Sequence, residues 1–278
     1  MTELLEPVLE LSGLHHTFFP GTPSEQVALQ GVDLSVQAGS FVVVVGINGS
    51  GKSTLLNAIA GTVSLDQGIV RFSGRDVTRW PEHRRAAFIG RVFQNPFSGT
   101  APNLTIAENL AIASGRGGRR GIFHWGLGAA RRAALAAQLD AMNLGLADRL
   151  DTPTGVLSGG ERQALTLLMA TIVRPALLLL DEHTAALDPR SAEQVVRLTE
   201  QTVQRDSLTT LMVTHSMHQA VRLGDRLLVM HRGRIVEDFA GARKRRLRVE
   251  DLLGQFDRLR NTDLVDESAA EMLRRSYV

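Results

Sequence analysis

A glycine-rich segment with a single lysine, GINGSGKST at Gly46–Thr54, has the residue types and the spacing that bind phosphate. It fits the pattern G-x-x-x-x-G-K-[ST], an apolar run (FVVVVG) leads into it, and a helical sequence (KSTLLNAIAG) follows it. Glycines let backbone N–H groups turn towards the β- and γ-phosphates, where a side chain would block the approach. Lys52 supplies positive charge, Ser53 offers a hydroxyl to Mg²⁺, and the helix N-terminus adds its dipole. A chance glycine-rich turn would lack this strand–loop–helix context.

Two adjacent carboxylates end a second apolar run, ALLLLDE. Asp181, at the end of a buried strand, can hold Mg²⁺ through its water shell. Glu182 can reach towards the γ-phosphate and orient or deprotonate the attacking water. A strand-ending acid on its own more often caps the next segment, but after a phosphate loop the catalytic interpretation is favoured.

A second candidate anion site lies at LSGGERQ, Leu157–Gln163, where Ser158 stands 23 positions before Asp181. A serine and two glycines at the start of a helix can bind an anion. This site would be redundant beside the phosphate loop of the same chain. It makes physical sense if it serves the nucleotide bound by a second copy.

Together these motifs resemble ABC-type ATPases in order and spacing, from about Val8 to Glu237. In that family a head-to-tail dimer encloses two ATP molecules, and each phosphate loop faces the partner's signature sequence, which LSGGERQ matches. The resemblance implies that Gln94 in RVFQNP belongs to the Q-loop, which senses Mg²⁺ and water and connects to a helical subdomain. Asp188 in AALDP matches the loop that contacts the opposite subunit. His215 in VTHS matches the switch histidine that approaches the γ-phosphate.

The resemblance also implies a full set of site residues. Phe18 or Phe19 matches the aromatic residue that stacks on adenine, and core packing is the alternative for one of the two. Lys52, Gln94, Glu182 and His215 are the expected catalytic residues, and Ser53, Gln94 and Asp181 the expected Mg²⁺ residues. The expected ATP-binding residues are Phe18, Gly46, Asn48, Gly49, Ser50, Gly51, Lys52, Ser53, Thr54, Ser158, Gly159, Gly160 and Asp188.

Two residues depart from the family's usual pattern. Glu161 replaces the commonest glutamine of the signature, and His183 replaces the proline that usually follows the two acids. Neither change removes a phosphate-binding or metal-binding group. We expect His183→Pro to change ATPase activity by less than about tenfold, or about 1.4 kcal/mol of activation free energy.

The surrounding pattern predicts an α/β fold. Two-residue alternation predicts half-exposed strands at Val8–Leu14 and Val32–Val36, and uniformly apolar runs predict strands buried on both faces. Further strands are expected at Leu208–His215 and at Asp225–Glu237, the latter bending at Gly233. Helices are expected at Lys52–Ala60, Ala129–Asn143, Gly160–Val173 and Pro189–Arg205. We infer a P-loop NTPase core with a mainly parallel sheet and an antiparallel β subdomain, residues 1–240. A helical subdomain at about 95–174 is inserted into it, and a short basic, helical tail follows at 241–278.

Composition narrows the functional classes. The 278 residues include no cysteine, which excludes disulfide scaffolds and thiolate metal sites, and 5% aromatic residues disfavour base-stacking surfaces. Only two of the 31 basic residues are lysines, and a small excess of arginine raises the pI without indicating a nucleic-acid partner.

Two basic clusters, Arg116–Arg132 and Ala242–Arg248, are either solvated faces or docking surfaces. No apolar stretch approaches the ~18 residues of a membrane span. The acidic N-terminus is not a secretory signal, so we expect a cytoplasmic protein.

The wider wording, including LSGGERQALTLLMATIV and LLLLDEHTAALDP, resembles one subgroup of importer ATPases. That subgroup serves tryptophan/tyrosine-type amino-acid systems. The resemblance implies a homodimeric, Mg²⁺- and ATP-dependent ATPase that closes on ATP and docks on separate permease subunits at the inner face of the membrane. An extracytoplasmic solute-binding protein would act with it indirectly, and no nucleic acid is expected. The alternative is a soluble single-domain ABC ATPase, for example of the cluster-assembly type.

Overall fold

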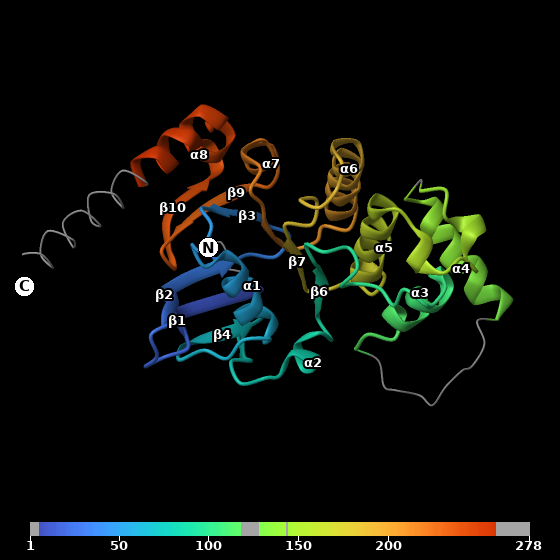
Figure 1. Ribbon diagram of the computed structural model, residues 1–278, viewed down its shortest axis with the longest axis horizontal. Coiled ribbons are helices and arrows are strands. Elements are labelled where there is room, and N and C mark those ends of the chain that lie inside the picture. The colour runs from blue at the N-terminus through green and yellow to red at the C-terminus, as the bar shows by residue number, and fades with distance from the viewer. Residues whose placement is uncertain (1–5, 118–127, 143, 260–278) are drawn as a thin grey trace, which may run out of the picture.

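The computed structural model describes residues 6–117, 128–142 and 144–259, and its elements form an α/β fold (Figure 1). Before the helical segment come β1 Leu9–Phe18, β2 Gln26–Val36, β3 Phe41–Gly46, α1 Lys52–Ala60, β4 Gln67–Phe72, β5 Arg75–Asp76, α2 Glu82–Arg85 and β6 Ile89–Val92. The helical segment contains α3 Ile106–Ser114, α4 Ala129–Asp140, the short 3₁₀ turns η1 Ala147–Arg149 and η2 Thr154–Val156, and α5 Gly159–Thr171. After it come β7 Leu177–Asp181, α6 Pro189–Arg205, β8 Thr210–Val213, α7 Met217–Arg222, β9 Arg226–His231, β10 Arg234–Ala240 and α8 Gly241–Arg246.

The larger sheet positions the predicted site. Its strand order is β10-β9-β3-β8-β7-β6, and all its neighbouring strands pair in parallel except β10 with β9. Every residue of β3 is buried, as the uniformly apolar sequence predicts for a strand covered on both faces. Parallel strands end at the same edge, so the segments after β3, β7 and β8 meet there. Those segments carry the phosphate loop, Glu182 and His215, and Asp181 is the last residue of β7.

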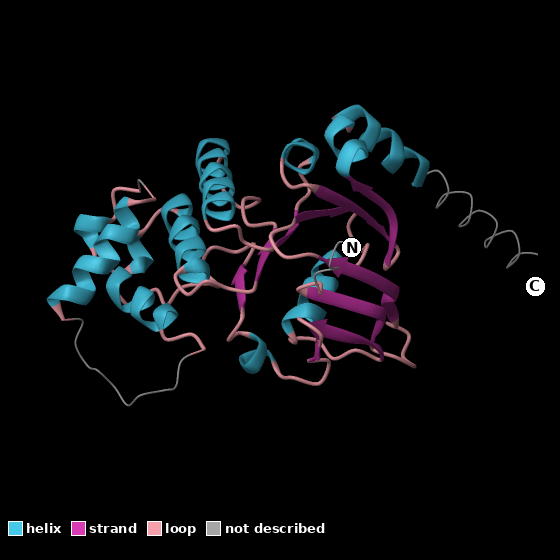
Figure 2. Ribbon diagram, turned by 180° about the vertical axis from the view of Figure 1, so that it is seen from behind, coloured by secondary structure: helices cyan, strands magenta, loops and turns pink. Residues whose placement is uncertain are grey.

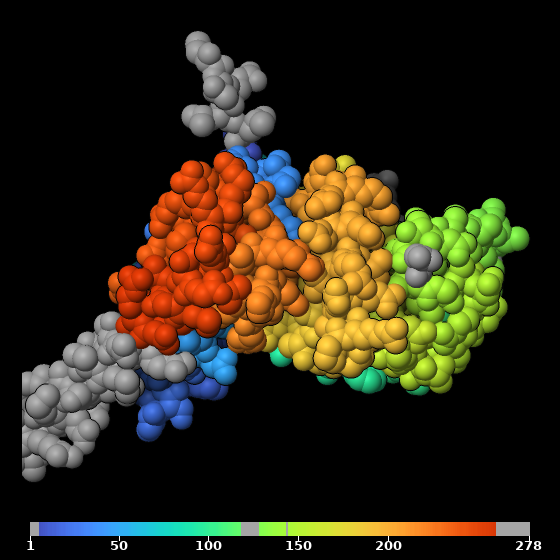
Figure 3. Space-filling view, turned by 90° about the horizontal axis from the view of Figure 1, so that it is seen from above, coloured from blue at the N-terminus to red at the C-terminus, as the bar shows by residue number. Residues whose placement is uncertain are grey.

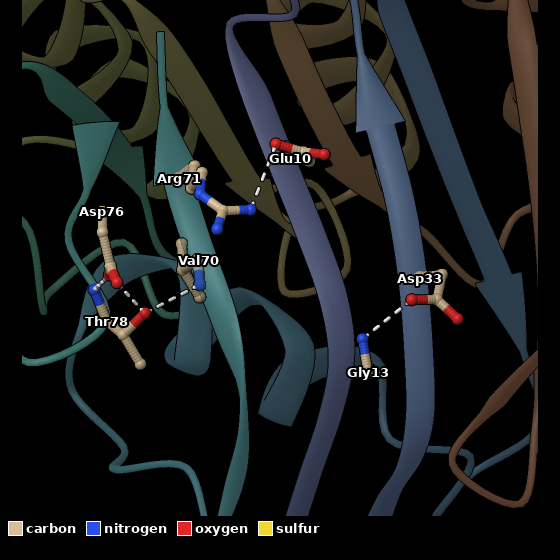
Figure 4. A network of polar contacts seen from close by, with 7 residues as sticks. All are labelled: Glu10, Gly13, Asp33, Val70, Arg71, Asp76 and Thr78. Atoms are coloured by element: carbon tan, nitrogen blue, oxygen red, sulfur yellow. Dashed lines mark hydrogen bonds and ion pairs between the residues drawn. The ribbon is translucent and has the colours of Figure 1, made fainter. Parts of the chain in front are cut away.

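A smaller antiparallel sheet, in the order β2-β1-β4-β5, supports one side of this edge. Figure 4 shows two of its cross-strand contacts. Asp33 on β2 accepts a hydrogen bond from the Gly13 N–H on β1 at 2.8 Å, and Glu10 on β1 lies 3.6 Å from Arg71 on β4. The sheet carries Phe18 as the last residue of β1.

The helical segment lies between β6 and β7, and it forms one end of the molecule (Figures 1 and 2). Two of its helices begin with capping boxes. Thr105 caps α3 with Glu108, and Ser158 caps α5 with Glu161. These caps fix where each helix starts, so the signature sequence is held at a defined N-terminus.

The sequence located some elements better than others. The predicted helix at Pro189–Arg205 has these bounds, with Asp188 as its N-cap, whereas the helix predicted to reach Asn143 ends at Asp140. The first strand runs on to Phe18. The strand predicted at Leu208–His215 is shorter, and the one at Asp225–Glu237 divides at Gly233 into β9 and β10. Strands β4 to β6 were not predicted individually.

The C-terminal cluster of basic residues contains one residue that is part of the core. Lys244 is buried, and its Nζ donates to the carbonyl oxygens of Val221 at 2.7 Å and Leu223 at 3.0 Å, at the C-terminal end of α7. Burial lowers the pKa of Lys244. Leu252 and Phe256 of the following helical turns join the same apolar core. From above, these C-terminal turns and the helical segment lie at opposite ends of the molecule (Figure 3).

The described residues of the other basic cluster, Arg116–Arg132, make different kinds of contact. Arg116 is half-buried and donates to the carbonyl oxygen of Ala170 at 2.8 Å, so it ties the end of α3 to α5. Arg132 forms an ion pair with Asp151. The middle of the cluster, at 118–127, lies outside the described residues. Among the residues that are described, no helix is long and apolar enough to cross a bilayer.

Lys244→Met should lower the free energy of unfolding by about 1–3 kcal/mol, because it leaves two helix-terminal carbonyl oxygens without their donor. Arg245→Met is the matched control, since Arg245 is exposed on the same helix, and it should change stability by less than about 0.5 kcal/mol. Urea unfolding of both variants measures the difference. Equal stabilities would show that the buried ammonium does not hold α7.

Candidate active site

A cavity of about 400 Å³ lies at the carboxyl edge of the larger sheet. It gathers residues from β1, β2, the phosphate loop, α1 and the segments that follow β6, β7 and β8. Its lining residues are Phe18, Gln26, Ala28, Asn48, Gly49, Ser50, Gly51, Lys52, Ser53, Thr54, Gln94, Glu182 and His215. The structure thus brings together the predicted phosphate loop, Q-loop glutamine, acid and histidine. Gln26 and Ala28 were missed, because an alternating strand carries no signal for a ligand.

The phosphate loop is built so that only glycine fits at its turns. Gly51 has φ +97°, and a Cβ there would lie 2.4 Å from the carbonyl oxygen of Ala28. A Cβ on Gly46 would lie 2.4 Å from the carbonyl oxygen of Met230. The loop is therefore pressed against β2 and β9, and its backbone can face inwards.

Lys52 occupies the centre of this loop. Its Nζ donates to the carbonyl oxygens of Gly46 and Ile47, each at 2.9 Å. Burial lowers the pKa of Lys52, while the negative charges of Glu182 and Asp181 act to raise it. The buried ammonium and the two carboxylates therefore form one electrostatic group.

The loop has the features of a phosphate site. The Ser50 hydroxyl is buried and makes no hydrogen bond within the described residues, so it offers an unused donor beside the cavity. Helix α1 starts at Lys52 without a side-chain cap, which leaves its N-terminal N–H groups for an anion. Ser53 and Asp181 supply the oxygen ligands that Mg²⁺ prefers when a phosphate completes its shell. The donor set therefore fits ATP with Mg²⁺.

Glu182 and His215 lie together in the lining of the cavity. His215 Nε2 contacts Glu182 Oε1 directly. The glutamate is nearly buried and has a left-handed backbone, φ +44°, and its N–H donates to the carbonyl oxygen of Val213 at 2.9 Å. This bond ties the end of β7 to β8 and aims the carboxylate at the histidine. A glutamate held in this way can accept a proton from water in the cavity.

The two candidate stacking residues differ in placement. Phe18 lines the cavity and meets the ring of His16 edge-on, with centroids 4.5 Å apart. Phe19 is 66% exposed and has a left-handed backbone, φ +52°. Of the two, Phe18 has the ring that an adenine in this cavity could contact.

The signature sequence does not line this cavity. Ser158 Oγ accepts from the Glu161 N–H, and Glu161 Oε2 accepts from the Ser158 N–H at 2.8 Å. Glutamate at position 161 thus closes the capping box as glutamine would. Asp188 caps α6 by accepting from the Arg190 and Ser191 N–H groups, each at 3.1 Å. Within one chain, then, Ser158, Gly159, Gly160 and Asp188 are held by their own helices, apart from the residues around Lys52.

The unusual histidine after the two acids is a core residue. His183 is buried, and its Nε2 lies 3.0 Å from the Thr199 hydroxyl on α6. That hydroxyl donates to the carbonyl oxygen of Val195, so the ring is assigned as the donor to Thr199. Burial lowers the pKa of His183 to about 4. His183 therefore stays neutral near pH 7 and links the Glu182 segment to α6.

Comparison with known proteins places these features in one family. The profile of the "ABC transporter" family matches residues 29–185. The tyrosine transport ATP-binding protein of Clostridioides difficile is 36% identical over 254 residues, which cover 90% of this chain and 99% of that protein. The lipoprotein-releasing system ATP-binding protein LolD of a Ruegeria species is 35% identical and covers 84% of this chain and 99% of its own.

Solved structures agree with the fold. A dimeric ATP-binding cassette in a post-hydrolysis state with ADP and Pi superposes with a TM-score of 0.71 at 27% identity, covering 84% of this chain and 98% of the cassette. A second ABC transporter cassette, in its ADP conformation, reaches a TM-score of 0.72 at 25% identity. It covers 91% of this chain and 98% of its own.

The buried His183 predicts a pH-dependent stability. Its pKa is about 4 in the folded chain and about 6.5 in the unfolded chain, so the unfolded state binds more protons between these values. The contribution of His183 to the free energy of unfolding should therefore be fully present above pH 6.5. The free energy of unfolding should fall by up to about 3 kcal/mol as the pH drops towards 4. Urea unfolding of the nucleotide-free protein at pH 4.5 and 7.5 measures this loss.

His183→Gln is the control for that measurement, because glutamine can still donate to Thr199 but does not titrate. The difference between the two pH values should shrink by about 2 kcal/mol or more in this variant. An unchanged difference would mean that other groups cause the loss.

Proposed function

Because this chain belongs to the ABC transporter family of ATP-binding proteins, we propose that it is the ATP-hydrolysing subunit of an importer for amino acids or similar small solutes. The observation that carries the proposal is the cavity in which the phosphate loop, Gln94, Glu182 and His215 meet. Similarity along nearly the whole chain to a tyrosine transport ATP-binding protein supports the class of solute.

In the proposed reaction, the phosphate loop from Gly46 to Thr54 holds the phosphates of ATP and Lys52 neutralises the terminal ones. Glu182 orients the attacking water and receives its proton, and His215 holds the carboxylate in place through their direct contact. Mg²⁺, when bound by Ser53, Gln94 and Asp181, would neutralise charge that develops on the transferred phosphoryl group. Phe18 would stack on the adenine.

We further propose that two copies of the chain together form each complete ATP site. Ser158, Gly159 and Gly160 begin α5 with an N-terminus that can bind phosphate, and Asp188 begins α6 beside them. In a head-to-tail homodimer these residues would cover the ATP held by the partner's phosphate loop. ATP would then join the two copies by charge-assisted contacts, and hydrolysis would remove those contacts and let the dimer open.

The remaining partners follow from this role. ATP-dependent closure within residues 1–240 would move the helical segment at about 95–174 through Gln94. The helical segment would transmit this motion to permease subunits, which are separate chains. A groove of about 240 Å³ beside β6, lined by Phe93, Gly99 and Met169 among others, offers a surface for such contact. The chain would sit at the inner face of the membrane, and an extracytoplasmic solute-binding protein would deliver the solute to the permease. Lys244 of α8 would buttress α7.

Glu182→Gln should keep nucleotide binding but lower ATP turnover by about 100-fold or more, because the amide cannot accept the proton of water. The variant should accumulate an ATP-bound dimer, which size-exclusion chromatography with light scattering would detect. Turnover near the wild-type rate would refute the role assigned to Glu182.

Lys52→Ala should instead weaken nucleotide binding itself, by about tenfold or more, since it removes the cation that faces the terminal phosphates. Fluorescence titration with an ATP analogue measures the affinity. The two variants together separate binding from chemistry, and similar defects in both would argue against this division of roles.

Purification of the tagged protein from membranes of its native host tests the transport role. The importer proposal predicts that integral-membrane permease subunits remain attached in stoichiometric amount, and mass spectrometry identifies them. Recovery with soluble assembly proteins instead would support a soluble ABC ATPase.

A further inference from the structure

Arg91, in the edge strand β6, makes a contact that no motif predicts. One nitrogen of its guanidinium, Nη2, lies 3.3 Å from Asp181 Oδ2 and donates to Asn57 Oδ1 at 2.7 Å. The side chains of Arg91 and Asp181 are each only 13% exposed. A charged pair this far from water interacts much more strongly than a pair on the surface.

The same guanidinium contacts other residues near the proposed metal position. Asn57 is on α1, the helix that begins at Lys52, and Asp181 ends β7. The guanidinium carbon also lies 4.8 Å from the ring centroid of Phe93, the residue before Gln94. Arg91 therefore joins the helix of the phosphate loop, the carboxylate and the approach to the Q-loop.

This placement affects the charge that a metal would experience. Asp181 carries one negative charge, and a guanidinium on Oδ2 compensates part of it before any other cation arrives. Asn57 holds the same guanidinium nitrogen, so this contact also limits the directions in which the carboxylate can turn.

We propose that Arg91 is a positioning residue of the ATPase site, which acts through Asp181 to set how strongly the site prefers Mg²⁺-bound nucleotide over free nucleotide. The inference rests on the proposed role of Asp181. Without Arg91, the less compensated carboxylate attracts Mg²⁺ more strongly and repels metal-free ATP more strongly. Both effects increase the dependence of nucleotide binding on the metal.

The test compares the affinity of the non-hydrolysable analogue AMPPNP in saturating Mg²⁺ with its affinity in EDTA, by calorimetry on the full chain. Arg91→Met should raise the ratio of the two affinities by about fivefold, the scale of a partly screened unit charge. ATP turnover at saturating Mg²⁺ should fall, because the carboxylate loses its orientation. Arg91→Lys keeps the charge and should leave the ratio within about twofold of the original.

Arg116→Met is the matched control. Arg116 lines the same groove as Arg91, but its guanidinium donates to backbone carbonyl oxygens, including that of Ala170. The ratio of the AMPPNP affinity in Mg²⁺ to that in EDTA should not change in this variant. Thermal melting confirms that each variant is folded, and Arg91→Gln replaces Arg91→Met if the latter is not.

A ratio within about twofold of the wild-type value in a folded Arg91→Met or Arg91→Gln protein would overturn the inference. A further variant, Asp181→Asn, distinguishes a failure of this inference from a failure of the proposed site. If Asp181→Asn lowers the ratio and the Arg91 variant leaves it unchanged, only the role of Arg91 is refuted. If Asp181→Asn itself leaves the ratio unchanged, the metal role of Asp181 is refuted, and the inference falls with it.

Discussion

The parallel pairing of β3, β8 and β7 is the constraint on which the rest of the site depends. Val43 pairs with Met212, and Leu180 pairs with the same residue from the other side. This register brings the ends of all three strands to one edge. The loops that follow are short, so a phosphate-binding turn, a pair of acids and a histidine meet, although more than 150 residues separate the turn from the histidine. A different strand order would leave the same motifs scattered.

The second constraint is electrostatic. Lys52, Asp181, Glu182 and Arg91 are largely removed from water, and each is placed against an opposite charge or a carbonyl oxygen. A buried charge without a partner is costly, so the site is stable only as a balanced group. The negative charge of the ATP phosphates and the positive charge of a divalent cation would be added to this group together and would partly offset each other. The same reasoning explains why a neutral, buried His183 is tolerated directly beside Glu182.

The sequence predicted the parts of this account that depend on local pattern. Glycine spacing located the phosphate loop, apolar runs located β3 and β7, and Asp188-Pro189 located the start of α6. Residues whose role depends on distant neighbours could not be predicted in this way. Arg91 in a four-residue edge strand, Lys244 beneath α7 and the ring of His183 against Thr199 are recognisable only once the fold brings their partners close. The choice between Phe18 and Phe19 likewise needed the direction of the chain after β1.

The central claim is that the signature sequence of one copy completes the ATP site of another, and photolabelling tests it directly. A Lys52→Ala chain carrying a mass tag is mixed with the wild-type chain, and an ATP analogue with a photoreactive group on the γ-phosphate is activated by light. Mass spectrometry should then find the label on Leu157–Gln163 of the tagged chain, whose own phosphate loop lacks Lys52 and binds the analogue more weakly. Label found only on the wild-type chain would contradict the claim.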